Sequence, residues 1–591
     1  MIEFSPPSSQ CDLYGEDFVA AVQNMQHPEG GFVDGMDFVR RMPLLPDEEI
    51  RRRADALDLH DPRAVDRFLS ENFAPRITLE SKYSPAERDI DDHIDHLLTD
   101  ALICHYPDAK PPYIAVKNEF PAADLVRFQD IDFGWDDDEV VDGWIGLADY
   151  ELSLDVVDQP KVARLMQLIE GVLDNKAHLI DTLGFVPNGN IACLATRAQP
   201  PMFADMIEMY TKFRERHGLE LYDENSPMIK YIPQMHRELL WWQRGMQDLE
   251  RNPAMVASEC VVLVRDEDNK PLGYMFRYWD SKDTPRDESY REDVEMATMA
   301  LKYDPSADVR ALFRNIRGAA AEGWDFCYSR QNKIPEQPWT NVTTELIPPD
   351  LNALMVKNMR VLAQGYALKS RLTNVSADER EVLKHRVQTL QAEADRLVSL
   401  IDRINYNPAT QLFHDYNFTT GKHVPAQTLA AYFPLYTGAL YDKRVDGLVE
   451  REVDFQLPGG WATSLHNGLE GQWDGDIEWI LLERKMQKGL ERAGYTDLAR
   501  RGRGRAIYCR SKVYAETRKI PEKVNGRTQK AVQKGEYTLH GDLGMSVGGL
   551  AAMRSEARIE HRKAAKKQGG NRIGLVLSAA ALMLSPLATG E

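Results

Sequence analysis

A mainly α-helical fold is predicted by three features of the sequence. Long stretches carry apolar residues at helical spacing, strand-like patterns are confined to one short pair of segments, and apolar residues are numerous enough for a large core. Hydrophobic residues make up 43% of the 591 residues and charged residues 28%, which are ordinary globular values. A chain of this length and composition is expected to fold rather than to remain disordered.

The helical pattern is clearest in three segments. One begins after residue 160 and carries an apolar stripe before Asn175; another follows Asp350. The third starts where Ser376 and Glu379 have the spacing of a capping box. We expect each stripe to face a core; the stripes comprise Val162, Leu165, Ile169 and Val172, then Met355, Met359 and Leu362, then Leu383, Val387, Leu390, Ala394, Leu397 and Ile401.

A small β-hairpin and three chain regions complete the predicted organisation. Residues 260–264 and 274–278 are strand-like and are joined by the turn-rich sequence RDEDNKPLG. No long linker interrupts the middle of the chain, so residues 61–555 are expected to form one helical domain. Residues 1–60 are predicted to be an extended, proline-punctuated N-terminal arm, and residues 556–591 a basic and apolar C-terminal tail.

Charge and cysteine usage narrow the classes of partner. The net charge of −20 disfavours a polyanion-binding surface, so no nucleic-acid partner is expected. The basic segment 500–534 is interpreted as a solvated rim. Six dispersed cysteines suggest reduced, mostly buried thiols, and His93 and His96 are interpreted as residues of a surface helix, so we assign no metal.

The two ends of the chain bear on location. The first residues lack a basic start followed by an apolar run, so a cytoplasmic protein is expected. Residues 573–588 form an apolar run that is shorter than the roughly 20 residues of a spanning helix. We therefore expect a loose or docked tail rather than a membrane anchor, and a monomer.

Turn-rich segments between the helical stripes repeatedly place tryptophan beside aspartate. A sugar ring has apolar faces and a rim of hydroxyls, so aromatic plates flanked by carboxylates, amides and guanidinium groups suit it. Phosphate-loop, HExxH and GxSxG motifs are absent from the sequence, which weakens nucleotidase, metallohydrolase and esterase readings. The segments are FGWDDD (133–138), VPNGN (186–190), TRAQPP (196–201), RYWDSKDTPRDES (277–289), AEGWDF (321–326), GQWDGD (471–476) and KGEY (534–537).

These segments, in this order, resemble those of the trehalases, inverting glycoside hydrolases whose fold is an (α/α) toroid of six helical hairpins. The resemblance runs from about residue 13 to residue 548. Its strongest stretches are FVPNGNIACLATRAQPPMF, RYWDSKDTPRDES, RGAAAEGWDF, LIPPDLNALM, AAYFPLYTGAL, PGGWATSL and GQWD. It implies an all-α toroid, with the β-hairpin as an insertion, that hydrolyses α,α-trehalose to two glucose molecules.

The resemblance also implies the site. Asp325 matches the family's general acid and Glu522 its general base, with Glu516 as a nearby competitor for the second role. Trp473 is equally open to a core or a sugar-platform reading. The substrate contacts implied by motif are Arg127, Trp135, Asp136, Asn188, Arg197, Gln199, Arg286, Glu288, Gly323 and Glu536.

Inverting hydrolysis needs one protonated carboxyl and one carboxylate that activates water, with no cofactor. The two carboxyls are then expected roughly 6.5–9.5 Å apart. Because several family signatures are altered here, among them Val524 after Glu522-Lys523, two alternatives remain. One is an impaired glucoside-binding paralogue, and the other is an inverting α-glucosidase of related fold.

Overall fold

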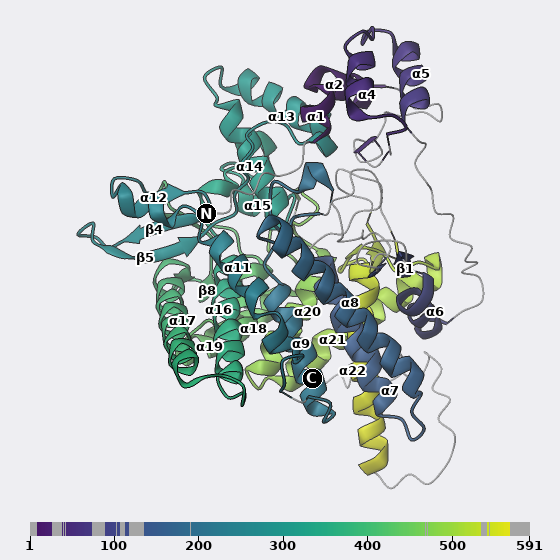
Figure 1. Cartoon of the computed structure of the whole chain (residues 1–591), viewed down its shortest axis with the longest axis vertical. Coiled ribbons are helices and arrows are strands. Elements are labelled where there is room, and N and C mark those ends of the chain that lie inside the picture. The colour runs from purple at the N-terminus through teal and green to yellow at the C-terminus, as the bar shows by residue number, and fades with distance from the viewer. Residues whose placement is uncertain are drawn as a thin grey trace, which may run out of the picture.

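The computed structural model confirms a mainly helical protein (Figure 1). It describes residues 9–25, 38–39, 41, 43–73, 89–101, 103–106, 113–116, 135–189, 191–220, 222–466, 468–469, 471–532, 541–542 and 544–567. Within these ranges the longer helices are α2 (Glu16–Gln23), α4 (Asp47–Ala54), α5 (Pro62–Asn72), α6 (Ile90–His96), α7 (Asp136–Leu152), α8 (Gln159–Leu183), α9 (Phe203–Arg216), α11 (Ile232–Trp242), α13 (Tyr290–Tyr303), α14 (Val309–Glu322), α16 (Pro349–Lys369), α17 (Ala377–Ile404), α19 (Val445–Phe455), α20 (Ile480–Arg492), α21 (Thr496–Thr517) and α22 (Gly544–Lys567).

Shorter elements connect these helices. The short helices used below are α1 (Gln10–Tyr14), α15 (Tyr328–Gln331) and α18 (Phe433–Thr437), and η4 (Asp287–Ser289) is a 3₁₀ turn. The strands form small antiparallel sheets. Those that matter here are β3 (Ala257–Ser258), β4 (Val261–Arg265), β5 (Pro271–Phe276), β13 (Ile477–Trp479), β14 (Lys523–Asn525) and β15 (Lys530–Ala531).

The three predicted stripes lie in helices α8, α16 and α17. Ser376 caps α17, because its hydroxyl accepts a hydrogen bond from the Glu379 amide at 3.1 Å. The apolar stripe of α17 is buried except at Val387, which packs against the core from a half-buried position. The β-hairpin is also confirmed: β4 pairs with β5, starting from Val261 opposite Phe276, and β3 adds a third strand.

Six helices form a closed inner ring. Contacts run from α7 to α9, α16, α18, α20 and α22, and α22 returns to α7. Helices α8, α11, α17 and α21 pack on this ring from outside. The inner helices are buried around most of their circumference, which explains why α16, unlike α17, has buried residues on nearly every face. This is the (α/α) toroid expected from the sequence.

Glycines allow the first and last inner helices to close the ring. Helices α7 and α22 lie side by side in Figure 1 and pack along much of their length. A Cβ atom placed on Gly143 would lie 2.7 Å from Gly548 Cα, and one placed on Gly548 would lie 2.8 Å from Val140 Cα. Both distances are shorter than backbone atoms tolerate, so the backbones approach only because side chains are missing there.

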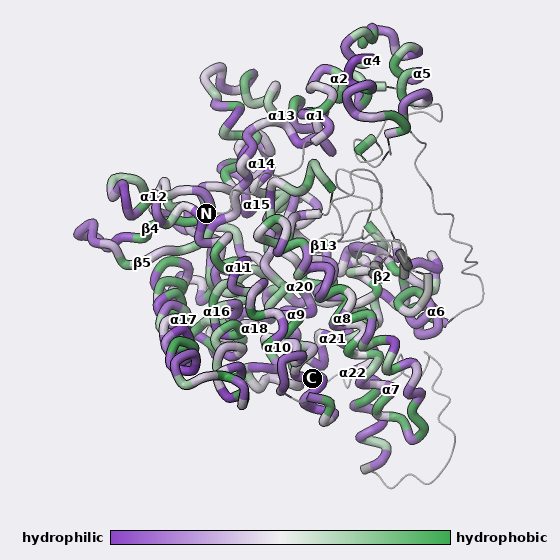
Figure 2. The backbone as a smooth tube through the Cα atoms, viewed as in Figure 1, coloured by the Kyte–Doolittle hydropathy of each residue, from purple (hydrophilic) through white to green (hydrophobic). Residues whose placement is uncertain are grey.

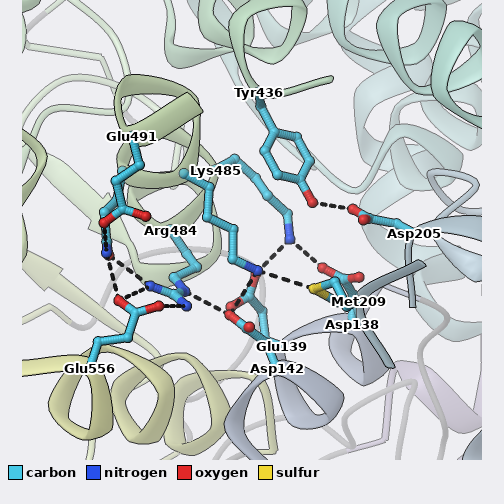
Figure 3. A network of polar contacts seen from close by, with 12 residues as sticks. Asp138, Glu139, Asp142, Asp205, Met209, Tyr436, Arg484, Lys485, Glu491 and Glu556 are labelled. Atoms are coloured by element: carbon cyan, nitrogen blue, oxygen red, sulfur yellow. Dashed lines mark hydrogen bonds and ion pairs between the residues drawn. The ribbon is translucent and has the colours of Figure 1, made fainter. Parts of the chain in front are cut away.

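A buried ionic network connects all six inner helices (Figure 3). Lys485 of α20 contacts Asp138 and, at 2.9 Å, Glu139 of α7. Arg484 of α20 pairs with Asp142 of α7 at 2.6 Å and with Glu556 of α22. The remaining members join α9, α16 and α18: Asp205 accepts hydrogen bonds from Lys357 and Tyr436, and Lys485 lies over the Tyr436 ring.

Electrostatics within this network follow from burial. Burial raises the pKa of Asp138 to about 7, although Lys485 opposes the shift. Burial also favours the neutral form of Lys485, but Asp138, Glu139 and Asp205 outweigh it and hold the pKa of the ammonium above its ordinary value. The charges are therefore mutually dependent, since each would be costly to bury alone.

The N-terminal region differs from the extended arm that was expected. Residues 10–72 include helices α1, α2, α4 and α5, which enclose a separate cluster of apolar side chains beside the ring (Figure 1). The alternation of polar and apolar residues between prolines was too short to reveal these helices. They attach to the main body through Asp287, whose carboxylate accepts from the Cys11 amide at 2.6 Å and whose carbonyl accepts from Gln23.

The C-terminal region also departs from the expected boundaries. Helix α22 continues through residue 555 to Lys567, and Arg503 of α21 is buried against Glu556 and Glu560 instead of forming a solvated rim. The apolar run 573–588 lies outside the described residues. Among the helices that are described, none is both long enough and apolar enough to cross a bilayer.

His93 is buried, not part of a surface helix face. Its side chain is fully enclosed, its ring packs beside that of Tyr514, and Nε2 lies 2.9 Å from Asp542 Oδ1. The buried residues of helix α6 are Ile90, His93 and Ile94, which helical spacing places on one face. Figure 2 shows hydrophilic residues along the same short helix. The sequence DDHIDH (91–96) is mostly charged or polar, so it gave little indication that one face of the helix is buried.

Replacing Gly548 with alanine should destabilise the ring closure. The new methyl group would overlap the α7 backbone, and we expect a loss of about 1–3 kcal/mol in the free energy of unfolding. Gly504→Ala in α21 is the matched control, since no atom lies within 4 Å of its added Cβ. That variant should gain up to about 1 kcal/mol from helix propensity. Denaturant titrations compare the two, and equal stabilities would contradict the close-approach argument.

Replacing Lys485 with methionine should lower the free energy of unfolding. The variant leaves Asp138 and Glu139 buried without their cation, and breaking a buried pair from one side costs about 3–5 kcal/mol. The exposed Lys530 offers a control substitution to methionine. Thermal and chemical unfolding measure the difference; a Lys485→Met protein as stable as the control would show that the network does not hold the ring together.

Candidate active site

Four tryptophans from distant parts of the chain gather at one end of the ring. The Trp473 ring stacks on Trp479 with centroids 3.7 Å apart and lies parallel to Trp135 at 6.1 Å. Trp324 leans against Trp473 at 5.6 Å. The indole N–H groups of Trp135, Trp324 and Trp473 are buried and donate to no acceptor within the described part of the chain. The cluster therefore combines flat apolar faces with available donors, as a sugar requires.

The N-terminal ends of the inner helices surround this cluster. Helix α7 begins directly after Trp135, with half-buried Asp136 as its first residue, and α9 begins four residues after Gln199. Helix α20 follows strand β13, and Ser546 in the first turn of α22 donates to the Glu522 carbonyl at 3.4 Å. Several helix dipoles thus present their positive ends to the same region, which favours carboxylates there.

Asp325 lies just beyond the end of α14. Gly323 ends the helix with a φ of +78°, and an added Cβ would come within 2.5 Å of the Trp135 ring. Glycine is needed for both the left-handed backbone and the ring contact. Gln199 also holds Trp135 in place, because its side-chain oxygen accepts a hydrogen bond from the Trp135 backbone amide at 2.8 Å. Asp325 itself is half-buried next to the tryptophan cluster.

The buried guanidinium of Arg330 packs against Trp324, the residue before Asp325. Arg330 lies 4.6 Å from the Trp324 ring centroid and pairs with Glu322, Asp350 and Asp415 at 2.8–2.9 Å. Burial raises the pKa of Glu322 to about 8 and that of Asp415 to about 6, while Arg330 opposes both shifts. One cation faces three carboxyls, so at least part of this cluster holds a proton near neutral pH.

Arg197 occupies the centre of a second polar group. It donates to Asn188 Oδ1 at 3.2 Å and to Glu288 Oε1 at 2.5 Å. Asn188 also donates to the Ala320 carbonyl of α14, close to Asp325 in sequence. Burial acts to raise the pKa of Glu288, but Arg197, Arg286 and Arg317 outweigh it and hold that pKa below its ordinary value. Glu288 is therefore an ionised acceptor.

Arg286 is fixed on a separate carboxylate. It donates to Asp293 through Nε and Nη2, at 3.1 and 2.7 Å from Oδ1, and its guanidinium lies 5.3 Å from the Phe326 ring centroid. Asp287, between Arg286 and Glu288, holds the N-terminal helices through Cys11 and Gln23. The N-terminal region is thus attached to the same loop that carries two predicted sugar contacts.

Glu522 is buried at the start of strand β14, with 6% of its surface exposed. Its competitor Glu516 is exposed in the last turn of α21. Gln472 connects the two carboxyl-bearing segments: its amide nitrogen donates to the Asp325 carbonyl, and its amide oxygen accepts from Lys523. Asp474, two residues further, caps α15 through the Tyr328 and Ser329 amides.

Most of the predicted site residues are therefore brought to one region. Arg127 and Glu536 lie outside the described residues. Trp473 is buried at the centre of the aromatic stack, as its core reading predicts. Sequence reasoning did not assign the residues that support the site. Arg317 and Gln472 lie in the matched stretches RGAAAEGWDF and GQWD, and Lys523 directly follows Glu522, so motif order was a signal for these three. Arg330 and Trp479 lie in no matched stretch.

This arrangement can bind a polyol and transfer protons. Buried arginines and an ionised glutamate offer donors and an acceptor in fixed directions, and the tryptophans offer apolar faces. The Gln472 amide bridges the backbone carbonyl of Asp325 and the ammonium of Lys523, the residue next to Glu522. Fold and site together define the class of protein: an (α/α) toroid whose site is rich in carboxyl groups and arginines and is lined by tryptophans.

Comparison with known proteins identifies the family. A model of the trehalase family matches residues 161–552, and the chain belongs to this family. A periplasmic trehalase of Escherichia coli is 31% identical over 383 residues, which cover 64% of this chain and 61% of that protein. A putative periplasmic trehalase of another Escherichia coli strain gives the same identity over 62% of its length. The chain thus spans less than two thirds of the length of these curated relatives.

A solved structure supports the fold. Neutral trehalase from Saccharomyces cerevisiae aligns with a TM-score of 0.53 and 16% identity, covering 81% of this chain and 82% of that one. The expectation of a cytoplasmic protein, in contrast, is wrong: the two curated relatives described above are periplasmic trehalases. Composition and the first residues carried too little information to decide the compartment.

The Arg330 cluster makes stability depend on pH. The folded-state pKa of Glu322, about 8, exceeds its ordinary value of 4.5, so the folded protein binds the proton more tightly. Its contribution is therefore present at low pH and is lost as pH rises toward and through about 8. In Glu322→Gln, the free energy of unfolding should fall less between about pH 5 and pH 9 than in the wild type. Denaturant titrations across this range measure both slopes.

The exposed Glu516→Gln variant is the control for a lost carboxyl, and its slope should follow that of the wild type. A Glu322→Gln slope as steep as the control would contradict the assignment of a raised pKa to Glu322.

Proposed function

We propose that this protein hydrolyses α,α-trehalose to two glucose molecules with inversion at the attacked carbon. The observation that carries the proposal is the Gln472 bridge in a chain of the trehalase family: one side chain ties the Asp325 segment to the Glu522 segment beside the tryptophan cluster. The curated relatives named as trehalases support the substrate.

In this proposal Asp325 is the general acid and Glu522 the general base. Asp325 donates a proton to the oxygen between the two sugars as that bond breaks. Glu522 removes a proton from the water that attacks the opposite face of the anomeric carbon. The burial of Glu522, together with the exposure of Glu516, supports assigning the base to Glu522.

The remaining side chains would bind and orient the sugar. We assign hydroxyl contacts to Asn188, Arg197, Arg286 and Glu288, and an apolar platform to Trp473. Because these residues are held by buried partners, their positions are fixed before substrate arrives, which lowers the entropic cost of binding. We propose a monomer as the active unit, since one chain supplies both carboxyls and the arginines.

Turnover of purified protein with trehalose, maltose and sucrose tests the function. Proton NMR should show glucose released from trehalose, initially with one α- and one β-anomer from each molecule, as inversion requires. Faster turnover of maltose would favour a general α-glucosidase instead. Calorimetric binding of trehalose with no glucose release would mean that the protein is a binding paralogue.

Asp325→Asn and Glu522→Gln should each lower kcat by about a hundredfold or more, the scale of general acid or base catalysis, while retaining sugar binding. Asp325→Asn should act normally on α-glucosyl fluoride, whose leaving group needs no proton. Glu516→Gln is the control and should retain wild-type turnover. If Glu516→Gln abolishes turnover while Glu522→Gln does not, the base is misassigned.

A further inference from the structure

Lys523 is a buried cation placed between the two candidate carboxyl residues. Only 1% of its side chain is exposed. Its ammonium lies 3.7 Å from Glu522 Oε2, donates to Gln472 Oε1 and lies 5.1 Å from the Trp479 ring centroid. Strand pairing fixes the backbone here, because Lys523 is opposite Trp479 in the β13–β14 ladder.

The electrostatic surroundings couple Lys523 to both carboxyls. Burial lowers the pKa of the Lys523 ammonium, and the charges of Glu522 and Asp325 oppose that shift. A buried ammonium is costly unless neighbouring carboxylates compensate it. The positive charge of Lys523 in turn favours the ionised form of a carboxylate 3.7 Å away, such as that of Glu522.

Other titratable groups near this strand have different neighbours. On the loop before β13, Asp474 accepts hydrogen bonds from Tyr328, Ser329 and Ser464. On β13, Glu478 is buried beside Glu483 and Arg510. Beyond Ile520, Asp542 pairs with His93 of α6 and accepts from the Ile520 amide. Lys523 is thus the cation of the described structure that contacts Glu522 directly.

We propose that Lys523 is a positioning residue that keeps Glu522 ionised for water activation and that Gln472 holds it in place by bridging it to the Asp325 backbone. This inference rests on the proposed function and extends it to the source of the base's protonation state. An inverting pair needs one protonated and one ionised carboxyl. The Lys523 ammonium lies 3.7 Å from the Glu522 carboxylate, and its charge acts more strongly on Glu522 than on Asp325, whose contact with Gln472 is through the backbone carbonyl.

The pH profile of kcat/KM tests this role, because its acidic limb reports ionisation of the base in the free enzyme. Lys523→Met removes the charge while approximately keeping the length of the side chain. Its acidic limb should move to higher pH by about one unit or more, the usual effect of losing an opposite charge at such a distance. Lys523→Arg retains the charge, and its acidic limb should remain near that of the wild type even if kcat falls.

A second variant serves if Lys523→Met does not fold, as judged by circular dichroism. Gln472→Glu keeps the lysine but adds a carboxylate that competes with Glu522 for it, so the acidic limb should again move upward. The exposed Lys519→Met is the matched control and should leave the profile unchanged.

The outcomes separate this inference from the proposed function. No glucose release by the wild type would refute the function itself. An active wild type with unshifted acidic limbs in folded Lys523→Met and Gln472→Glu proteins would refute the role of Lys523 alone. A fall in kcat without movement of the limb would mean that Lys523 only supports packing.

Discussion

The buried ionic network at the centre of the ring is the constraint on which the remaining structure depends. Each inner helix contributes at least one charged or phenolic side chain to it. Separating one of these charges from its partners would leave a buried charge without compensation, which is energetically costly. Buried pairs of this kind fix relative position more than they add stability. The six inner helices therefore have one favourable register, and ring closure at Gly143 and Gly548 is possible only in that register.

The candidate site uses the rigidity that this network provides. Along α16, Asp350 pairs with Arg330 beneath Trp324, and Lys357 enters the network seven residues later, about 10 Å deeper at 1.5 Å per residue. Both layers consist of charges that are buried and compensated. A site that must hold two carboxyl residues in different protonation states needs such a frame, because small shifts in separation or solvation would alter both pKa values.

The loop that carries Arg286 and Glu288 is held from two directions. Arg317 of α14 donates to the Thr284 and Pro285 carbonyls, and the N-terminal helices bind Asp287 between the two predicted contacts. A segment expected to be an extended arm thus supports the loop that carries two of the proposed sugar contacts. This arrangement gives the N-terminal helices a role in the site, although they lie outside the ring and have their own apolar cluster.

The sequence alone determined the helical class and the β-hairpin, because amphipathic spacing is a local property, and its ordered motifs predicted the candidate site residues. The capping of α17 by Ser376 and the pairing of β4 with β5 follow from neighbouring residues. Only the tertiary structure decided which charges are buried. Asp138, Lys485 and Arg503 look like surface residues in sequence, but Asp138 and Lys485 are buried against each other across 347 residues, and Arg503 is buried against Glu560, 57 residues away. The same applies to Gln472, which donates to the Asp325 carbonyl 147 residues away and accepts from Lys523 51 residues away, contacts that no local pattern encodes.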